Sequence, residues 1–191
     1  HTYTNTHTYA HRIATAPNTG QILYDYKIWK IFINKLESNI KDNLILRPHP
    51  YPNDDWKMKL RFSDDFGASR ITEKRLLKKD ILRSKIIINT TTQTTLYESM
   101  KSGVPTLLIS DRKILKINPF IQELLEEFKE NNIMFSDPVK AAQHVRNIWS
   151  EPLEWWNSDK IIKLREKFSL ICSKEVKNDL LFWKNFFNSQ L

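Results

Sequence analysis

Short apolar runs, separated by stretches with helical periodicity, occupy the middle of this chain, and their order constrains the fold more than any other feature. The runs lie at 44–46, 86–88, 105–109 and 133–135. An apolar run without polar alternation is typical of a strand buried on both faces of a sheet. Around these runs, helices are predicted over 21–40, 72–84, 95–102, 119–129 and 138–151. Strands that alternate with helices predict an α/β fold with a doubly wound parallel sheet of the Rossmann-like kind.

Residues 53–72 fit this scheme less well. Their large apolar side chains alternate with polar ones, as in a half-buried strand; they are Trp56, Met58, Leu60 and Phe62. The same side chains could equally belong to an irregular insertion. Both interpretations stay open on the sequence alone.

The chain after Pro152 is predicted to be helical to its end. Its large apolar residues are expected to pack back across the sheet, and they are Trp155, Trp156, Ile161, Ile162, Leu164, Phe168, Ile171, Leu180, Trp183 and Phe186. Because these helices are also basic and rich in tryptophan, peripheral contact with a membrane is the alternative.

The ends of the chain suggest how it is organised. Residues 1–20 are polar and turn-rich and begin with His1 rather than Met. We expect this segment to be the start of a fragment, with an N-terminal domain and half of the active site missing. Residues 21–191 are expected to form one domain that includes C-terminal helices from about residue 153.

Composition limits the classes of function. With 191 residues, 40% of them hydrophobic, the chain can form one domain with a real core. The single cysteine, Cys172, excludes an internal disulfide framework and a multi-cysteine zinc site. The sequence contains neither an apolar run long enough to span a membrane nor a signal peptide. We therefore expect a cytoplasmic protein that could act at the inner face of the membrane.

The formal net charge of +8 suits nucleic acid, anionic lipid headgroups or phosphorylated small molecules. General compositional drift is the stronger explanation of the charge, because Lys, Asn and Ile are abundant while Ala is scarce and there are only three Gly. The lysines are dispersed and the aromatic residues fall mostly at packing positions, which argues against nucleic acid as a partner. A basic nucleic-acid-binding module is kept as an alternative function.

A hydroxyl-rich loop follows the apolar run at 86–88. Its threonines are Thr90, Thr91, Thr92, Thr94 and Thr95. In an open parallel sheet, ligands bind beyond the carboxyl ends of the strands, where such loops converge. The helix expected from Thr95 adds unpaired backbone N–H groups and the positive end of its dipole, and both favour an anion. The loop is therefore predicted to bind phosphate.

A structural role also explains part of this loop. Thr95 and Glu98 have the spacing of a capping box, in which each side chain bonds the backbone N–H of the other residue. Capping needs only these two residues. The other threonines remain unexplained by it, although threonine is also favourable at a strand end.

The motif RPHP at 47–50 follows the first apolar run. If the first two strands are neighbours, Arg47 could pair with a phosphate and His49 could donate to a phosphate or a base. Equally, Arg47 could pair with a carboxylate and His49 could pack against proline. His7 and His11 have the spacing of a helical metal pair, but no third ligand accompanies them, so no metal site is predicted.

Together these motifs resemble the C-terminal nucleotide-binding domain of GT-B glycosyltransferases. The resemblance covers residues 43–111 and rests on RPHP, IIINTTTQTT and LYESMKSGVPTLLIS, with Gly103 at the expected left-handed end of a helix. From about Gln21 onward, the chain is also similar to a family of transferases from bacterial surface-carbohydrate loci. That similarity rests on RPHPYPNDDW, the threonine loop with LYES, AAQHVRNIW and EWW.

The GT-B resemblance implies a site for a nucleotide-sugar donor. Glu98 would accept hydrogen bonds from ribose hydroxyls. The phosphates of the donor would be held by Thr91, Thr92, Thr94 and Thr95. The resemblance implies no obligatory metal and no cofactor. Unlike many GT-B enzymes, this loop contains no glycine.

The same resemblance suggests the reaction. Arg47 and His49 are the catalytic candidates, with His49 placed at the leaving group, and the general base would come from the missing N-terminal domain. The leading hypothesis is transfer of a sugar to a glycan or lipid-linked acceptor in bacterial surface polysaccharide assembly. The His-Pro pair and the hydroxyl loop are also similar to transferases that use CMP-sugars and to CDP-glycerol polymerases. A polyol-phosphate transferase with a CDP donor is therefore an alternative. The sequence leaves the donor nucleotide open among UDP, CMP and CDP.

Overall fold

The computed structural model describes residues 19–48, 57–72, 76–90, 92, 94–110, 119–172 and 178–189. The helices before strand β2 (Thr106–Ile109) are α1 (Thr19–Lys35), α2 (Ser38–Lys41), α3 (Met58–Phe66), the 3-10 helix η1 (Ala68–Arg70), α4 (Leu77–Arg83) and α5 (Thr94–Lys101). Those after β2 are α6 (Pro119–Glu130), α7 (Pro138–Ile148), α8 (Pro152–Trp156), α9 (Asp159–Cys172) and α10 (Asp179–Asn188). The strands are β1 (Ile87–Asn89), β2 (Thr106–Ile109) and β3 (Met134–Phe135). Because α1 begins at Thr19, it overlaps the predicted irregular segment 1–20, of which residues 1–18 lie outside the described residues.

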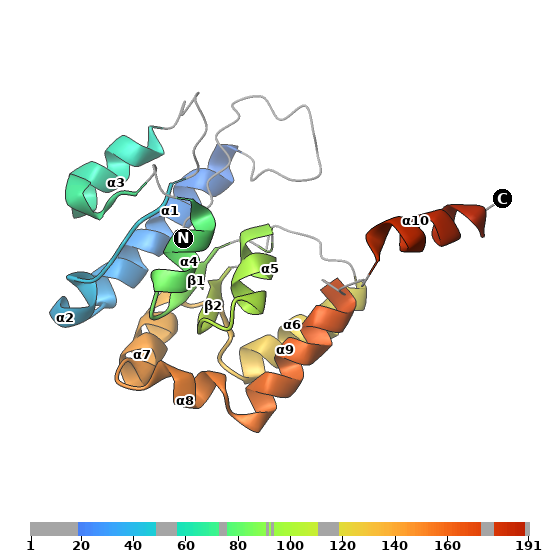
Figure 1. The fold of residues 1–191 in the computed structure, drawn as a ribbon. Coiled ribbons are helices and arrows are strands. Elements are labelled where there is room, and N and C mark those ends of the chain that lie inside the picture. Colours follow the sequence, from blue (N-terminus) through green and yellow to red (C-terminus); the bar gives the residue numbers. More distant parts are fainter. Residues whose placement is uncertain are drawn as a thin grey trace.

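The three strands form one parallel sheet in the order β1-β2-β3. α5 and α6 connect successive strands in the same direction, and right-handed crossovers therefore place both helices on one face. α1 and α7 lie on the opposite face (Figure 1). Helices on both faces of a parallel sheet confirm the predicted α/β, Rossmann-like fold class.

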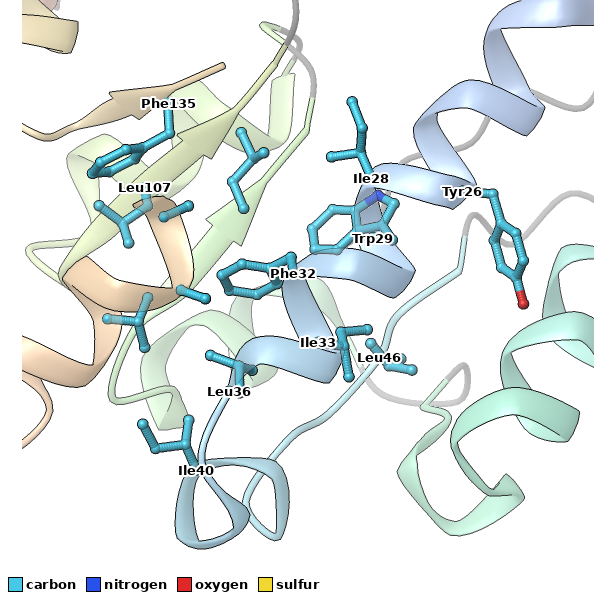
Figure 2. Packing of buried hydrophobic residues seen from close by; sticks show 14 of the residues in the cluster. Tyr26, Ile28, Trp29, Phe32, Ile33, Leu36, Ile40, Leu46, Leu107 and Phe135 are labelled. Atoms are coloured by element: carbon cyan, nitrogen blue, oxygen red, sulfur yellow. The ribbon is translucent and has the colours of Figure 1, made fainter. Parts of the chain in front are cut away.

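The first hydrophobic core lies between the sheet and the α1–α7 layer. Figure 2 shows Phe32 of α1 pointing toward Leu107 of β2, with Phe135 of β3 close by. Leu107 and Ile109 face this side because successive strand residues point to opposite faces. The α7 residues Ala141 and Ala142 are small, which lets α7 approach α1 closely.

The second core lies on the other face of the sheet. Leu108 of β2 and Met134 of β3 point into it, and they pack with residues of α5, α6, α8 and α9. Trp156 of α8 and Phe128 of α6 are completely buried there. β2 is thus buried on both faces, as its unbroken apolar run predicts.

Two local sequence features determine where elements begin and end. Asp137 is the N-cap of α7, and its carboxylate accepts from the Val139 N–H at 2.8 Å, with Pro138 as the first helical residue. Gly103, two residues after the end of α5, has φ of +79°, a conformation that other residues rarely adopt. Both features agree with the sequence prediction.

The segment at 44–46 differs from its prediction. Among the described residues, Leu46 forms one parallel bridge with Ile71 and pairs with no strand of the sheet. Ile45 is 54% exposed, whereas Leu46 is buried. The prediction of a strand buried on both faces is therefore wrong here. A three-residue apolar run cannot distinguish such a strand from an extended segment that buries only some of its side chains.

Residues 58–66 form a helix, so neither interpretation left open for this part of the chain is correct. Met58 and Phe62 are buried, while Leu60 between them is exposed. Met58 and Phe62 are four residues apart and therefore share one face of the helix. The exposed Leu60 between them made the sequence look like an alternating strand. Trp56 lies outside the described residues.

α10 does not pack across the sheet as predicted. Figure 1 shows this helix extending away from the rest of the chain. Leu180, Trp183 and Phe186 are all exposed, in contrast to Trp156, Ile161, Leu164 and Phe168 upstream. Aromatic side chains of α10 contact one another instead, and they are Phe182, Trp183, Phe186 and Phe187. Contact with a membrane surface stays a prediction. Across the described part of the chain, no helix combines the length and the apolar character needed to cross a membrane.

His144 on α7 is an ionisable side chain enclosed among aromatic rings. Its ring lies 5.4 Å from that of Phe135 and 4.9 Å from that of Trp155, measured between centroids. Its Nε2 atom is buried without a hydrogen-bond partner. Burial disfavours the charged imidazolium, and it lowers the pKa of His144 from 6.5 to about 4.

Acidification is therefore expected to destabilise the protein through this residue. The unfolded chain takes up the proton near pH 6.5, whereas the folded chain resists it until about pH 4. The stability contributed by neutral His144 is complete above pH 6.5 and falls as the pH is lowered toward 4. Urea unfolding at several pH values should show a weaker pH dependence for His144→Phe than for the unmodified chain. Identical pH dependences would contradict this assignment.

Candidate functional site

The hydroxyl-rich loop lies at the carboxyl edge of the parallel sheet. β1 ends at Asn89, Thr90 follows directly, and α5 begins at Thr94. This is the edge at which open α/β sheets bind their ligands. The position that sequence analysis predicted for the loop, between a buried strand and a helix, is therefore confirmed.

α5 presents its N-terminus to this edge. The helix has eight residues, and its first turn contains no acidic side chain that would oppose an anion. Thr92 and Thr94 are exposed, and Glu98 is exposed one turn further along. These three predicted site residues are thus accessible to a ligand in the same short stretch of chain.

Thr95 has a different environment from its neighbours. It is buried, and its backbone carbonyl accepts from the Ser99 hydroxyl at 2.7 Å. Because α5 begins at Thr94, Thr95 is a helical residue rather than the N-cap. The predicted capping box between Thr95 and Glu98 is therefore wrong, since a capping box requires Thr95 to precede the helix.

Asn89 is a polar residue that the sequence analysis did not single out. It is the last residue of β1 and only 2% exposed, yet its side-chain Nδ2 has no hydrogen-bond partner. The adjacent Thr90 Oγ1 is also buried and without a partner. Buried polar atoms are almost always paired, so two adjacent unpaired ones mark this strand end as unusual. The change from three isoleucines to asparagine in IIIN was the available sequence feature.

Arg47 pairs with Asp80 of α4. Its Nη1 atom donates to Asp80 Oδ2, and both side chains are 12% exposed. This confirms the alternative that a carboxylate partners Arg47. Asp80 Oδ1 is buried and makes no hydrogen bond. For Arg47 to contact a phosphate, it would have to share its guanidinium with Asp80 or exchange one anion for the other.

The Arg47–Asp80 pair borders a cavity of about 600 Å³. The cavity lies between α1, the segment 43–47, residues 83–88 and α7, and Trp29, Phe32 and Trp149 contribute to its walls. Of the loop threonines that the structure describes, none lines it. The structure therefore places Arg47 in this cavity rather than in a common pocket with those threonines.

Two of the predicted residues, His49 and Thr91, lie outside the described residues. Within the described ranges, no group of three or more His, Cys, Asp or Glu side chains is arranged to hold a metal ion.

A parallel sheet covered by helices, with a hydroxyl-rich loop and a helix N-terminus at its carboxyl edge, defines a Rossmann-like α/β protein. The family model described as LIC12162 family transferase matches residues 2–187, and the chain belongs to this transferase family. The predicted membership of a transferase family is thereby confirmed. No curated protein and no solved structure matches the chain.

Proposed function

We propose that this protein transfers a sugar from a nucleotide-sugar donor, in the manner of a GT-B-type glycosyltransferase, during assembly of a bacterial surface polysaccharide. Membership of a transferase family supports the enzymatic class. The observation that carries the choice of donor is the hydroxyl-rich loop between β1 and the N-terminus of α5. Such an edge suits the phosphates of an activated sugar.

The loop would act by stabilising the departing nucleotide. Negative charge grows on the phosphate oxygens as the bond to the sugar breaks. The α5 amides and the hydroxyls of Thr92 and Thr94 are donors suited to these oxygens. Thr91 and the buried Thr95 are the further donors in this proposal. Glu98 would accept from the ribose hydroxyls. In this proposal the protein contributes preorganised donors to the transition state and needs no metal.

Arg47 and His49 are assigned to the leaving group in the same proposal, which for Arg47 requires that its guanidinium turn from the cavity it borders with Asp80 toward the α5 loop. The Arg47 guanidinium carries a permanent positive charge that Asp80 partly neutralises. His49 would donate to the departing phosphate or to the base. The acceptor, a glycan or a lipid-linked sugar, would be activated by a base from another part of the enzyme. The polyol-phosphate transferase with a CDP donor requires the same phosphate site and is the second candidate.

A thermal-shift panel of UDP-, CMP- and CDP-linked donors tests this proposal and identifies the nucleotide of the donor. A ligand at about a hundred times its Kd stabilises the folded chain by about 2.7 kcal/mol. For a domain of this size, that corresponds to a rise in Tm of about 5–10 °C. Thr94→Val and Glu98→Gln should each reduce the rise, since they remove a donor to phosphate and an acceptor for ribose.

Glu130→Gln is the matched control, because Glu130 is also exposed but lies at the far end of α6. It should leave the ligand-induced shift unchanged. The proposal would be wrong if no nucleotide or nucleotide sugar raised the Tm, or if Thr94→Val and Glu98→Gln behaved like Glu130→Gln.

A further inference from the structure

The end of β1 contains buried hydrogen-bonding capacity that the described residues do not use. The Nδ2 atom of Asn89 and the Oγ1 atom of Thr90 are both shielded from solvent and unpaired. Two other buried polar residues, Ser99 and Thr106, differ in this respect. The Ser99 hydroxyl donates to the Thr95 carbonyl at 2.7 Å, and the Thr106 hydroxyl donates to the Val104 carbonyl at 2.8 Å.

The strand register places Asn89 beneath α5. Asn89 is aligned with Leu108 of β2, and aligned residues of a parallel pair share one face of the sheet. Leu108 packs in the second core together with Leu96 and Met100 of α5. The Asn89 side chain therefore lies on the α5 face, at the carboxyl end of β1, where the N-terminus of α5 also lies.

The unused atom of Asn89 determines what kind of ligand it can bind. An amide NH₂ group is a hydrogen-bond donor, so its partner must be an acceptor. Phosphoryl oxygens are strong acceptors. Other donors lie in the same stretch of chain, namely the amides at the start of α5 and the hydroxyls of the exposed Thr92 and Thr94. A neutral amide also adds no negative charge that would repel a phosphate.

We propose that Asn89 is a phosphate-binding residue, whose Nδ2 donates to a phosphoryl oxygen bound at the N-terminus of α5, with the Thr90 hydroxyl as a second donor. This inference rests on the proposed function and names a residue that determines specificity at the same site. Because Asn89 is 2% exposed, its bond to the ligand forms away from bulk water, where hydrogen bonds are stronger. The site then favours a ligand oxygen that only accepts over a hydroxyl that competes as a donor.

The test uses the whole chain and two probes, inorganic phosphate and inorganic pyrophosphate, titrated by calorimetry. Asn89→Leu removes the amide and keeps a side chain of similar size. It should weaken binding of the better probe at least tenfold, while Tm in the absence of ligand stays equal or rises, because an unpaired buried donor has been removed. A residue with only a structural role would not combine weaker binding with unchanged or higher stability.

Asn89→Asp provides a second variant with nearly the same shape. It replaces the donor by a negative charge and should abolish binding of both probes. Asn157→Asp, at an exposed position after α8, makes the same chemical change as a control and should bind like the unmodified chain. Unchanged pyrophosphate affinity in Asn89→Leu, or no binding of either probe to the unmodified chain, would overturn the assignment of Asn89.

The outcome is separable from that of the proposed function. If nucleotides still raise the Tm of Asn89→Leu as they do for the unmodified chain, the role of Asn89 is wrong and the donor site stands. If no nucleotide raises the Tm of the unmodified chain while pyrophosphate binding depends on Asn89, the phosphate site stands and the nucleotide-sugar donor is wrong.

Discussion

Replacement of Trp156 by alanine is expected to lower the free energy of unfolding by about 3–5 kcal/mol. The side chain is completely buried in the second core. The guanidinium of Arg165 lies 4.6 Å from the ring centroid, and its Nη1 donates to the Trp156 carbonyl at 3.2 Å. The substitution would leave a large cavity and remove this cation–π contact. Urea unfolding followed by circular dichroism measures the change.

Trp183→Ala is the matched comparison, because the same residue type on α10 is 51% exposed. Its removal should change the free energy of unfolding by no more than about 0.5 kcal/mol, as for most surface substitutions. An equal loss in both variants would mean that α10 is packed in the folded chain and would contradict its exposed position.

Replacement of Asp80 by alanine should destabilise the protein by about 3–5 kcal/mol, because it leaves the Arg47 charge largely buried without this partner. The double variant Arg47→Met with Asp80→Leu should recover most of that loss, since apolar side chains fit the walls of the adjoining cavity. A double-mutant cycle from urea unfolding gives the coupling energy between the two side chains.

This cycle also separates the two roles considered for Arg47. A strong coupling energy shows that each of the two buried charges needs the other in the folded chain. If Arg47→Ala kept most of the stability but lost the nucleotide-induced rise in Tm, ligand binding would be the main role and the expected coupling would be wrong.

The strands of the sheet could be predicted because each contains a continuous apolar run, which suits a strand buried on both faces. The runs at 86–88, 105–109 and 133–135 correspond to β1, β2 and β3 within one residue at each end. Continuous apolar residues fit a strand that is covered on both faces. The start of α7 was predictable for a similar reason, since Asp137 and Pro138 favour a helix start locally, whatever packs around it.

Other elements depended on contacts that are distant in sequence. Leu44–Leu46 looks like another buried strand, but Leu46 pairs with Ile71 and not with β1. The exposed face of α10 was also missed, because its sequence predicts packing that the fold does not provide. Its aromatic residues have the spacing of packing residues, but whether a surface is present to cover them depends on the rest of the fold.

The candidate site was predictable to a similar extent. The place of the threonine loop follows from the order of strand and helix, whereas the pairing of Arg47 with Asp80 joins residues 33 positions apart. Asn89 was missed because a polar residue after an apolar run looks like the end of a strand. Only the register with Leu108 shows that its side chain is enclosed beneath α5.

The aromatic cluster of α10 has a thermodynamic consequence. Its four rings contact one another and remain exposed to water. Any association that covered them would release hydrating water and show a negative change in heat capacity. It would strengthen on warming from low temperature and respond little to ionic strength, in contrast to binding driven by the positive net charge.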